Sequence, residues 1–485
     1  MLARLYRLVP GRIRELVSPF LSGFYLPAHY YTRLVDKTDQ ASSSPATRDE
    51  PAVVAYFGIN EERARLWAKR ILGDSTAYTP GSRAWIWSQE SLLRREQPDC
   101  HVLLVETNPV TALILRLRRG SGFTMPMWVQ FCLDISRPLA ELKKASSKLR
   151  EQIPRKIRKY SLTYEVSEDE AQLRSFFDTM HVPYISGRHG HTAFLPTWSE
   201  IYRVFNNSDL LIVKRTAQTP VETKQVAAGK HEESVERKAG QTAGERAGEA
   251  EGEKAVEKVS DKPEQGADEE TGDESGEESG VKTGEKAGKI EAAGGKVDEI
   301  SGGLLEYDGE VATLRYLGLK NNDEGYLHMG GMPALYYFAM LHAMDRGSRI
   351  FNMGGTNPFL SDGVAFFKLT FKPFVDRISY LNEFPVWLTV RKPSQFLERF
   401  FMANPFLVLR RDGNFDQVLL VDNRRDDYLE KLDSLLKKTR CEGVKEYLFA
   451  VRINTPGLQE TLRQRIPGNA TLRIVGWDAV LPGIV

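Results

Sequence analysis

One long segment of the chain lacks the residues needed to build a core. From Thr216 to Ser301, 86 residues contain no Phe, Trp or Tyr and carry 12 Lys and Arg against 22 Asp and Glu. Such a stretch cannot bury enough apolar surface to offset the conformational entropy that folding removes. The sequence therefore predicts a long disordered insertion at residues 216–301. Two uses stay open for it: an acidic solvated tether, or an arm that binds a partner or shields the protein itself.

The rest of the chain has the composition of a globular protein. It holds 54 Lys and Arg against 43 Asp and Glu, so it is basic overall. The chain has three cysteines far apart in sequence, Cys100, Cys132 and Cys441, which is not the even, closely spaced set of a disulfide framework. This indicates a reducing compartment. No apolar run approaches 18 residues and the first residues lack a secretory pattern, so we expect a cytoplasmic protein without a membrane span. No spacing predicts a metal site, and we expect no permanently bound cofactor.

The first residues form a pattern of their own. Residues 2–21 have apolar side chains at helical spacing, opposite Arg4, Arg7, Arg12 and Arg14. The pattern predicts a basic amphipathic helix, which either packs on its own domain or contacts the inner face of a membrane peripherally. Because a stretch with linker composition follows, we expect residues 1–50 to lie outside the folded domains.

Strands that alternate with helices predict three folded parts of α/β type. The first part is 51–145, the second is 146–390 around the insertion, and the third is 391–485. In the first part we expect strands at 52–57, 84–87 and 101–105 and helices at 61–72 and around Ser91. In the third part we expect a β-α-β-α-β order, with strands at 416–421, 446–452 and 471–475 and helices at 426–438 and 455–465.

The insertion interrupts the second part without dividing it. Expected strands at 209–214 and 303–307 flank it, and Asp308-Gly309 is a tight hairpin turn to a further strand at 310–317. A long loop in place of a hairpin turn is tolerable because the entropy cost of closing a loop grows slowly with its length.

The remaining predictions for the second part are a basic turn at 154–159, a strand at 164–166, helices at 168–179 and 332–345, and strands at 326–329, 349–352 and 364–371.

A glycine pair before a helix is the first candidate site. Gly330 and Gly331 would let a ligand approach the backbone, and the free amides at the start of a helix attract an anion. Met329, Gly330, Gly331 and Met332 are therefore candidates for binding the pyrophosphate of a nucleotide or coenzyme A. The alternative is an ordinary turn before a helix.

An acid and an amine six residues apart form the second candidate site. Asp362 and Lys368 follow Gly354-Gly355, and such a pair can position an amine nucleophile and stabilise charge on an acyl carbonyl. We predict that both are catalytic and that Asn357, which lies between them and the glycines, binds substrate. The alternative is a surface ion pair beside a hydrophobic strand.

A cluster of titratable residues forms the third candidate site. Tyr184, Arg188, His189 and His191 are expected in a loop after a helix, where binding groups tend to lie. We predict that Tyr184, Arg188 and His189 contact the substrate, the alternative being structural histidines.

The order of these motifs resembles the GNAT-type N-acyltransferases, in the branch of the Fem peptidyltransferases and polysaccharide-cluster acetyltransferases. The resemblance covers roughly 130 residues between Pro154 and Pro373 and rests on FFDTMHVPYISGRHG, YLHMGGMPALYYFAMLHAMDRGSRIFNMGG and NPFLSDGVAFFKLTFKP. It implies a mixed, splayed sheet with flanking helices. It also implies that Gly330-Gly331 is the pyrophosphate loop and that Asp362, Gly363 and Lys368 lie at the acyl-transfer site. The first part of the chain is either a degenerate copy of this unit or a different α/β domain.

The resemblance implies an N-acyltransferase that moves an acyl group from an acyl-CoA-type donor to an amine, such as an amino sugar or a cell-envelope precursor. The usual GNAT motif with two spaced glycines is replaced here by MGGMPA, and Fem-like relatives use aminoacyl-tRNA, so an aminoacyl-tRNA donor is one alternative. A non-catalytic binding or scaffold protein is another. The expected partners are small-molecule donor and acceptor without specific nucleic acid, because diffuse positive charge fits a solvated surface.

Overall fold

The structure is a computed structural model that describes 24–33, 52–73, 76–108, 111–112, 114–115, 117, 122–190, 195–216, 297–376 and 385–481. These residues belong to one of two structural units of the chain, the unit formed by Met1–Ala217 and Lys296–Val485. The predicted N-terminal helix, the linker and residues 217–296 of the predicted insertion lie outside the described residues. Within the described ranges, no helix is long and apolar enough to cross a membrane, and no three His, Cys, Asp or Glu side chains gather as metal ligands.

The first sheet has the strand order β3-β1-β2-β4-β13-β5. Its central pair, β2 with β4, is parallel, and the other pairs are antiparallel. Its elements are β1 (Tyr25–Arg33), β2 (Val53–Phe57), α3 (Glu61–Leu72), β3 (Thr76–Trp85), α4 (Gln89–Glu96), β4 (Val102–Glu106), β5 (Phe123–Met125) and β13 (Val386–Val390).

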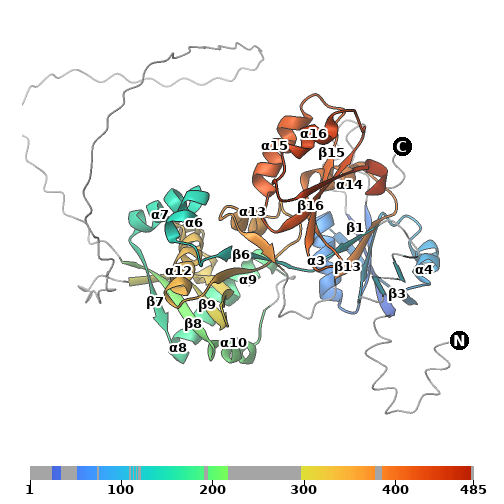
Figure 1. Cartoon of the computed structure of the whole chain (residues 1–485). Helices are drawn as coiled ribbons and strands as arrows, with labels where there is room; N and C mark the ends of the chain where they lie inside the picture. Colours follow the sequence, from blue (N-terminus) through green and yellow to red (C-terminus); the bar gives the residue numbers. More distant parts are fainter. Residues whose placement is uncertain are drawn as a thin grey trace, which may run out of the picture. The chain divides into compact units, whose positions relative to one another are not determined.

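The second sheet has the strand order β12-β6-β11-β10-β9-β8-β7 (Figure 1). Its single parallel pair is β10 with β11. The strands are β6 (Val129–Asp134), β7 (Leu162–Ser167), β8 (Ser208–Thr216), β9 (Val297–Asp308), β10 (Val311–Leu319), β11 (Ile350–Thr356) and β12 (Phe374–Asp376). The helices are α6 (Leu139–Ala145), η2 (Lys148–Gln152), α7 (Ile153–Tyr160), α8 (Glu170–Phe176), η3 (Phe177–His181), α9 (Val182–His189), α10 (Trp198–Phe205), η5 (Lys320–Asn322), α11 (Glu324–Met329), α12 (Gly331–Asp345) and α13 (Gly363–Leu369).

The third sheet has the order β14-β15-β16-β17, with the last three strands parallel. Two helices connect these parallel strands, as the β-α-β-α-β pattern predicted. The elements are α14 (Gln395–Ala403), β14 (Phe406–Leu409), β15 (Phe415–Val421), α15 (Tyr428–Thr439), β16 (Val444–Val451), α16 (Leu458–Arg463), β17 (Thr471–Gly476) and η6 (Trp477–Ala479). The fold is therefore mixed α/β with flanking helices, as expected.

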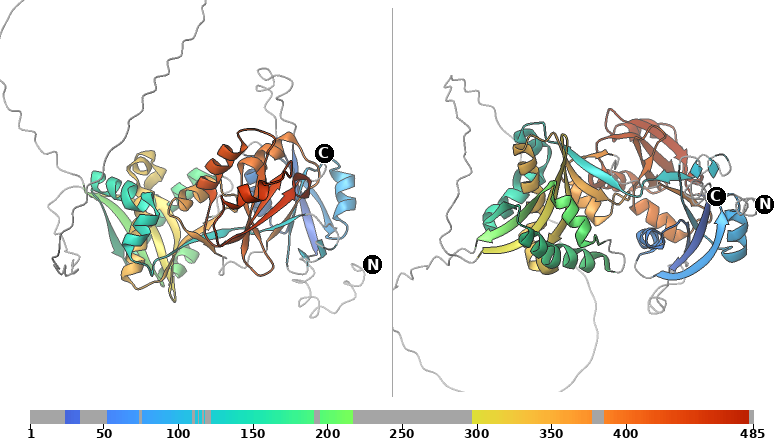
Figure 2. Two further views of the ribbon diagram at one scale, coloured as in Figure 1. Left: turned by 45° about the horizontal axis from the view of Figure 1, so that its top comes forward. Right: turned by 90° about the horizontal axis from the view of Figure 1, so that it is seen from below.

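The first two sheets share one sequence of strand directions. Reading β3-β1-β2-β4-β13-β5 and β8-β9-β10-β11-β6-β12, both sheets show two antiparallel pairs, one parallel pair and two more antiparallel pairs. Each sheet also takes a strand from a distant part of the chain. Strand β6 follows the first sheet in sequence but lies in the second, and β13 follows the second sheet but lies in the first (Figure 2).

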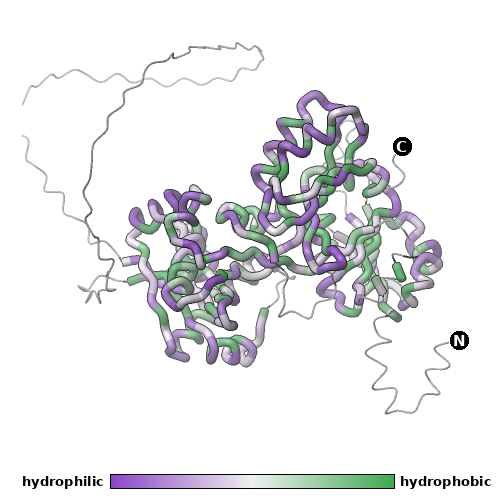
Figure 3. The backbone as a smooth tube through the Cα atoms, in the orientation of Figure 1, coloured by the Kyte–Doolittle hydropathy of each residue, from purple (hydrophilic) through white to green (hydrophobic). Residues whose placement is uncertain are grey.

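The ends of the undescribed segment lie on neighbouring strands. Strand β8 ends at Thr216 and β9 begins at Val297, and these two residues pair in the antiparallel register. Residues 217–296 therefore connect the ends of two adjacent strands, as the sequence predicted. Figure 3 shows that the strands of this sheet are largely hydrophobic, whereas many residues of the outer helices α6 and α7 are hydrophilic.

Several local predictions were wrong. The expected turn at 154–159 is helix α7, which continues directly from the π-helical turn η2, so Pro154 is the second residue of α7. The expected strand at 326–329 is helix α11, which starts at the cap residue Asp323. The expected strand at 364–371 is helix α13, and the expected loop after the helix at 168–179 is the end of η3 followed by helix α9. In addition, β1 and β13 were not predicted.

Candidate active site

A cavity opens where the parallel strands β10 and β11 separate. The two strands pair only through Val311–Thr313 and Ile350–Asn352. Beyond these residues, Leu314–Leu317 and Met353–Gly355 line a cavity of about 630 Å³. The remaining walls come from Trp128, η3, α9, α11, α12 and α13. The sheet is therefore splayed at its only parallel pair among the described strands, as the resemblance implied.

Lys368 lies in this cavity with almost no exposed surface. Its side chain is only 2% exposed, and its Nζ donates hydrogen bonds to the carbonyl oxygens of Gly354 (2.8 Å) and Gly355 (2.9 Å). Burial lowers the pKa of this lysine from 10.5 to about 7, although the nearby Cys132 and Asp362 oppose the shift. The amine therefore titrates near neutral pH, which is a property that catalytic groups often share.

The backbone at Gly354 fixes the position of the two carbonyl acceptors. Its φ of +80° lies in the left-handed region, and a Cβ there would approach the carbonyl oxygen of Leu314 to 2.9 Å. Only glycine meets both conditions without strain. The side chain of Asn352 supports the same bend because its Oδ1 accepts a hydrogen bond from the Gly354 amide at 2.9 Å.

Asp362 caps the helix that carries Lys368. Its Oδ1 accepts hydrogen bonds from the amides of Val364 (3.0 Å) and Ala365 (3.3 Å), which are free donors at the start of α13. In the described part of the chain no hydrogen bond joins Asp362 to Lys368. The structure thus places both predicted catalytic residues on one short helix, with the lysine in the cavity and the aspartate at the N-terminus of the helix.

Tyr184 and Arg188 line the cavity from α9. The Arg188 guanidinium lies 5.0 Å from the centroid of the Tyr184 ring, and burial raises the pKa of Tyr184. Asn357 is half-buried outside the lining, and its Oδ1 accepts a hydrogen bond from the Phe359 amide. His189 is the last residue of α9, its side chain is not described, and His191 lies outside the described residues.

The predicted pyrophosphate loop is partly closed. Gly330 ends α11 with a φ of +92°, and α12 begins directly at the buried Gly331. Lys156 crosses this junction, since its Nζ donates to the His328 carbonyl at 2.9 Å and its Cδ would lie only 2.7 Å from a Cβ on Gly330. Pro333 removes one further amide donor from the first turn of α12. Of residues 329–332, only Met332 lines the cavity.

Several residues of the lining were not among the predicted site residues. His181 is buried, and its Nδ1 lies 2.9 Å from the Leu317 carbonyl, while burial lowers its pKa. Trp128, Arg315 and Tyr316 come from strands or from the residue before a strand, where side chains alternate between faces. Which face of a strand borders a cavity depends on how far the neighbouring strands separate. The alternation of apolar and polar residues along a strand does not indicate that separation. Tyr336, in the apolar helix α12, resembled a core residue.

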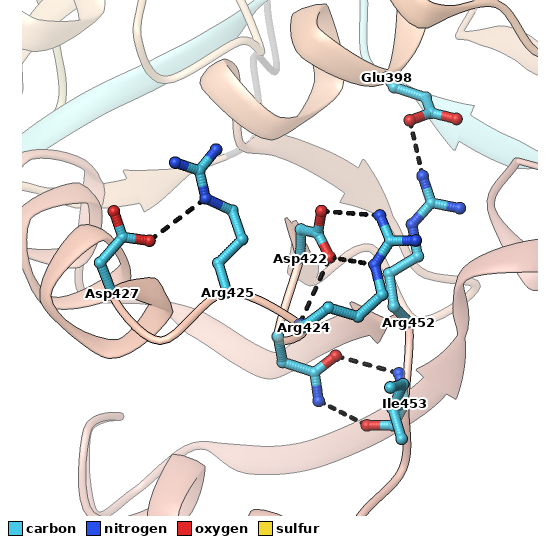
Figure 4. A network of polar contacts seen from close by, with 8 residues as sticks. Glu398, Asp422, Arg424, Arg425, Asp427, Arg452 and Ile453 are labelled. Atoms are coloured by element: carbon cyan, nitrogen blue, oxygen red, sulfur yellow. Dashed lines mark hydrogen bonds and ion pairs between the residues drawn. The ribbon is translucent and has the colours of Figure 1, made fainter.

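A second charged cluster lies where β15 and β16 end (Figure 4). Arg424 pairs with Asp422 at 2.9 Å, Arg425 with Asp427 at 3.3 Å, and Arg452 with Glu398 at 2.6 Å. Each arginine is paired with a carboxylate, Asp427 also pairs with Lys431 at 2.6 Å, and the Ile453 amide donates to Asn423 Oδ1 at 3.0 Å, so the cluster joins the two loops.

Residues 231–384 match the FemAB family. The match begins within 217–296 and runs through β9, β10, α11, α12, β11, α13 and β12, which include the splayed pair and Lys368. It supports the Fem branch of the resemblance and a transferase. The wider GNAT assignment stays a prediction. Among curated proteins, no significant match was found.

Solved structures with some likeness to this chain include a crystal structure of FemX, at 13% identity and a TM-score of 0.30, covering 72% of this chain and 83% of that one. The C-terminal domain of a lysylphosphatidylglycerol synthetase candidate from Agrobacterium fabrum is 10% identical, with a TM-score of 0.27. The match covers 71% of this chain and 79% of that one. L-PGS from Bacillus licheniformis is 10% identical, with a TM-score of 0.24. The match covers 70% of this chain and 77% of that one.

Proposed function

We propose that the protein is an aminoacyltransferase that moves an aminoacyl group from an aminoacyl-tRNA ester to the amine of an acceptor in the cytoplasm. The observation that carries the proposal is the buried Lys368 amine in the cavity between the splayed strands, with a pKa near 7. The FemAB match favours this donor over the acyl-CoA that the sequence first indicated. Closure of the Gly330 junction by Lys156 and Pro333 favours it too, because few amides are left for a pyrophosphate.

The proposed reaction replaces an ester bond by an amide bond. The acceptor nitrogen attacks the ester carbonyl carbon, the new C–N bond forms, and the bond from carbon to the ribose oxygen breaks. One proton leaves the nitrogen and finally resides on the ribose oxygen. In between, the carbonyl oxygen carries negative charge, which a positioned hydrogen-bond donor stabilises.

Lys368 is suited to donate to that oxygen. An ammonium group has three N–H donors, and two of them point to the carbonyls of Gly354 and Gly355. The third is available in the protonated form, which is well populated at neutral pH when the pKa is about 7. We propose that Tyr184 and Arg188 hold the acceptor at the cavity wall, that Asp362 positions Lys368 through the helix, and that Asn357 shapes the loop before it. His189 stays a candidate for substrate binding.

A donor comparison tests the proposal. The full-length chain is incubated with mixed radiolabelled aminoacyl-tRNAs and, in parallel, with labelled acetyl-CoA and longer acyl-CoAs, together with amino sugars and lysine-containing peptides as acceptors. Label transferred from aminoacyl-tRNA to an amine supports the proposal. Transfer from acyl-CoA alone would restore the acyl-CoA interpretation. If neither donor is consumed or bound, the scaffold interpretation replaces both.

A further inference from the structure

The helices α6, η2 and α7 form a strongly basic surface. Residues 139–160 contain eight cations and two acids. We call this stretch the basic helical surface. Arg150 pairs with the carboxylate of Glu151. Within the described residues, none of the other seven cations forms an ion pair, unlike the arginines of the cluster at the ends of β15 and β16. The cations are Lys143, Lys144, Lys148, Arg150, Arg155, Lys156, Arg158 and Lys159.

This surface borders the cavity through two lysines. Lys148 places its Nζ 5.6 Å from the ring centroid of Phe367, which lines the cavity. Lys156 bonds the His328 carbonyl at the junction of α11 and α12, next to the lining residues Leu327 and Met332. Burial and the charge of Lys156 lower the pKa of Lys148, so the two like charges are close enough to interact. An anion between them would remove that repulsion.

The extent of the surface indicates the kind of anion. At about 1.5 Å per helical residue, Lys148 and Lys159 are separated by roughly 15 Å along the helix direction. Successive phosphates of a nucleic acid strand recur every few ångströms, so several of them fit along this length. None of the exposed large apolar side chains among the described residues lies within 139–160. A membrane-binding helix would expose such side chains to the lipid, so the surface fits RNA better than it fits a membrane.

We infer that the basic helical surface docks the RNA part of the donor and that Lys148 and Lys156 hold the phosphates nearest to the transferred group. The inference rests on the proposed function, but RNA binding is measurable without transfer. It revises the expectation from sequence that the basic residues at 154–159 are merely solvated, because the structure places them on a helix beside the cavity.

The test is fluorescence anisotropy with labelled deacylated tRNA and the full-length chain at several salt concentrations. The variant Arg155→Glu/Arg158→Glu changes two exposed residues of the surface. The control Lys437→Glu/Lys438→Glu makes the same charge change on the exposed side of α15 in the third sheet. We expect at least tenfold weaker binding for the first variant and a shallower dependence of log K on log salt, because fewer counterions are released. We expect near wild-type binding for the control.

Two other outcomes overturn the inference, and a third separates it from the proposed function. Equal binding by both variants would show that RNA docks elsewhere or only through net charge. Loss of binding to phosphatidylglycerol vesicles in the first variant, with tRNA binding unchanged, would assign the surface to a membrane. Wild-type RNA binding that depends on Arg155 and Arg158, without any aminoacyl transfer, would keep the docking surface and refute the proposed reaction.

Lys148→Met tests the junction between the surface and the cavity. It should raise the KM for aminoacyl-tRNA at least threefold with little change in kcat, because the residue contacts the donor away from the reacting bond. A fall in kcat at unchanged KM would contradict this placement.

Discussion

The first and second sheets have the same order of strand directions around one parallel pair. They differ in where the hydrogen bonding between the two parallel strands stops. In the first sheet β2 and β4 stay paired to Phe57, the last residue of β2. Just beyond, the buried Glu106 forms an ion pair with Arg63 at 3.0 Å and accepts a hydrogen bond from the Ile59 amide at 2.8 Å. In the second sheet β10 continues to Leu319 after pairing has ended at Thr313. There the buried charge is Lys368, held by carbonyls. A closed ion pair stabilises a fold, whereas a buried amine without a bonded carboxylate is available for chemistry.

The largest expected effect comes from removing the amine of the second sheet. Lys368→Met should lower kcat for aminoacyl transfer about 100- to 1000-fold, the usual loss when an oxyanion donor is removed. Thermal unfolding should change little, because methionine fits a buried site and the cost of burying a charge disappears. The rate in single-turnover assays and the Tm together check this. A variant that retains a tenth of wild-type kcat would rule out the proposed role.

The matching change in the first sheet should affect stability instead. Arg63→Met leaves Glu106 buried without its guanidinium partner, which we expect to cost about 2–3 kcal/mol of unfolding free energy, since Arg63 is partly exposed. Urea denaturation measures the loss, and Arg63→Met/Glu106→Gln should recover part of it. The folded fraction should keep nearly normal kcat. If kcat fell as in Lys368→Met, the two sheets would not divide stability and chemistry in this way.

The pH dependence sharpens the contrast further. With a pKa lowered to about 7, Lys368 is an ammonium below pH 7 and loses its proton above it. The ratio of wild-type to Lys368→Met rates should therefore be constant below about pH 7 and fall by up to tenfold per pH unit above it. Titration of the acceptor amine cancels in this ratio. A ratio that stays constant to pH 9 would contradict the lowered pKa or the need for the ammonium.

The smallest effect is expected at the helix cap. Asp362→Ala removes the acceptor for two amides of α13 and should cost about 1 kcal/mol of stability, with a few-fold loss of kcat through misplacement of Lys368. Asp362→Asn keeps a capping oxygen and serves as the control, with near wild-type values of both. If Asp362→Asn lost as much activity as Lys368→Met, the aspartate itself would take part in the reaction.

Prediction from sequence succeeded where one short stretch determines the outcome. The bounds of α3 follow from Asn60 and an apolar spacing of 3.6 residues, and those of α12 are close to the prediction. The hairpin of β9 and β10 follows from Asp308-Gly309. Short helices such as α7 and α11 were missed because charge and glycine obscured a pattern of only six to eight residues.

Prediction failed where distant segments meet. Nothing near Val386 announces that β13 pairs with β4, because the pairing is decided by a free edge far away in sequence. Lys368 was identified as a functional residue, but its burial against Gly354 and Gly355 depends on how far β10 and β11 separate, and that separation is not encoded in a local motif.

The exchange of β6 and β13 sets the timing of assembly during synthesis. When the ribosome has made β4, the strand that must lie beside it is still roughly 280 residues away. At the usual 5–20 residues per second, this delay lasts about 15–60 s, during which the edge of β4 has no permanent partner. The first sheet is thus the earliest to be translated but cannot close until the second is complete, so the N-terminal half must be shielded from aggregation while it waits.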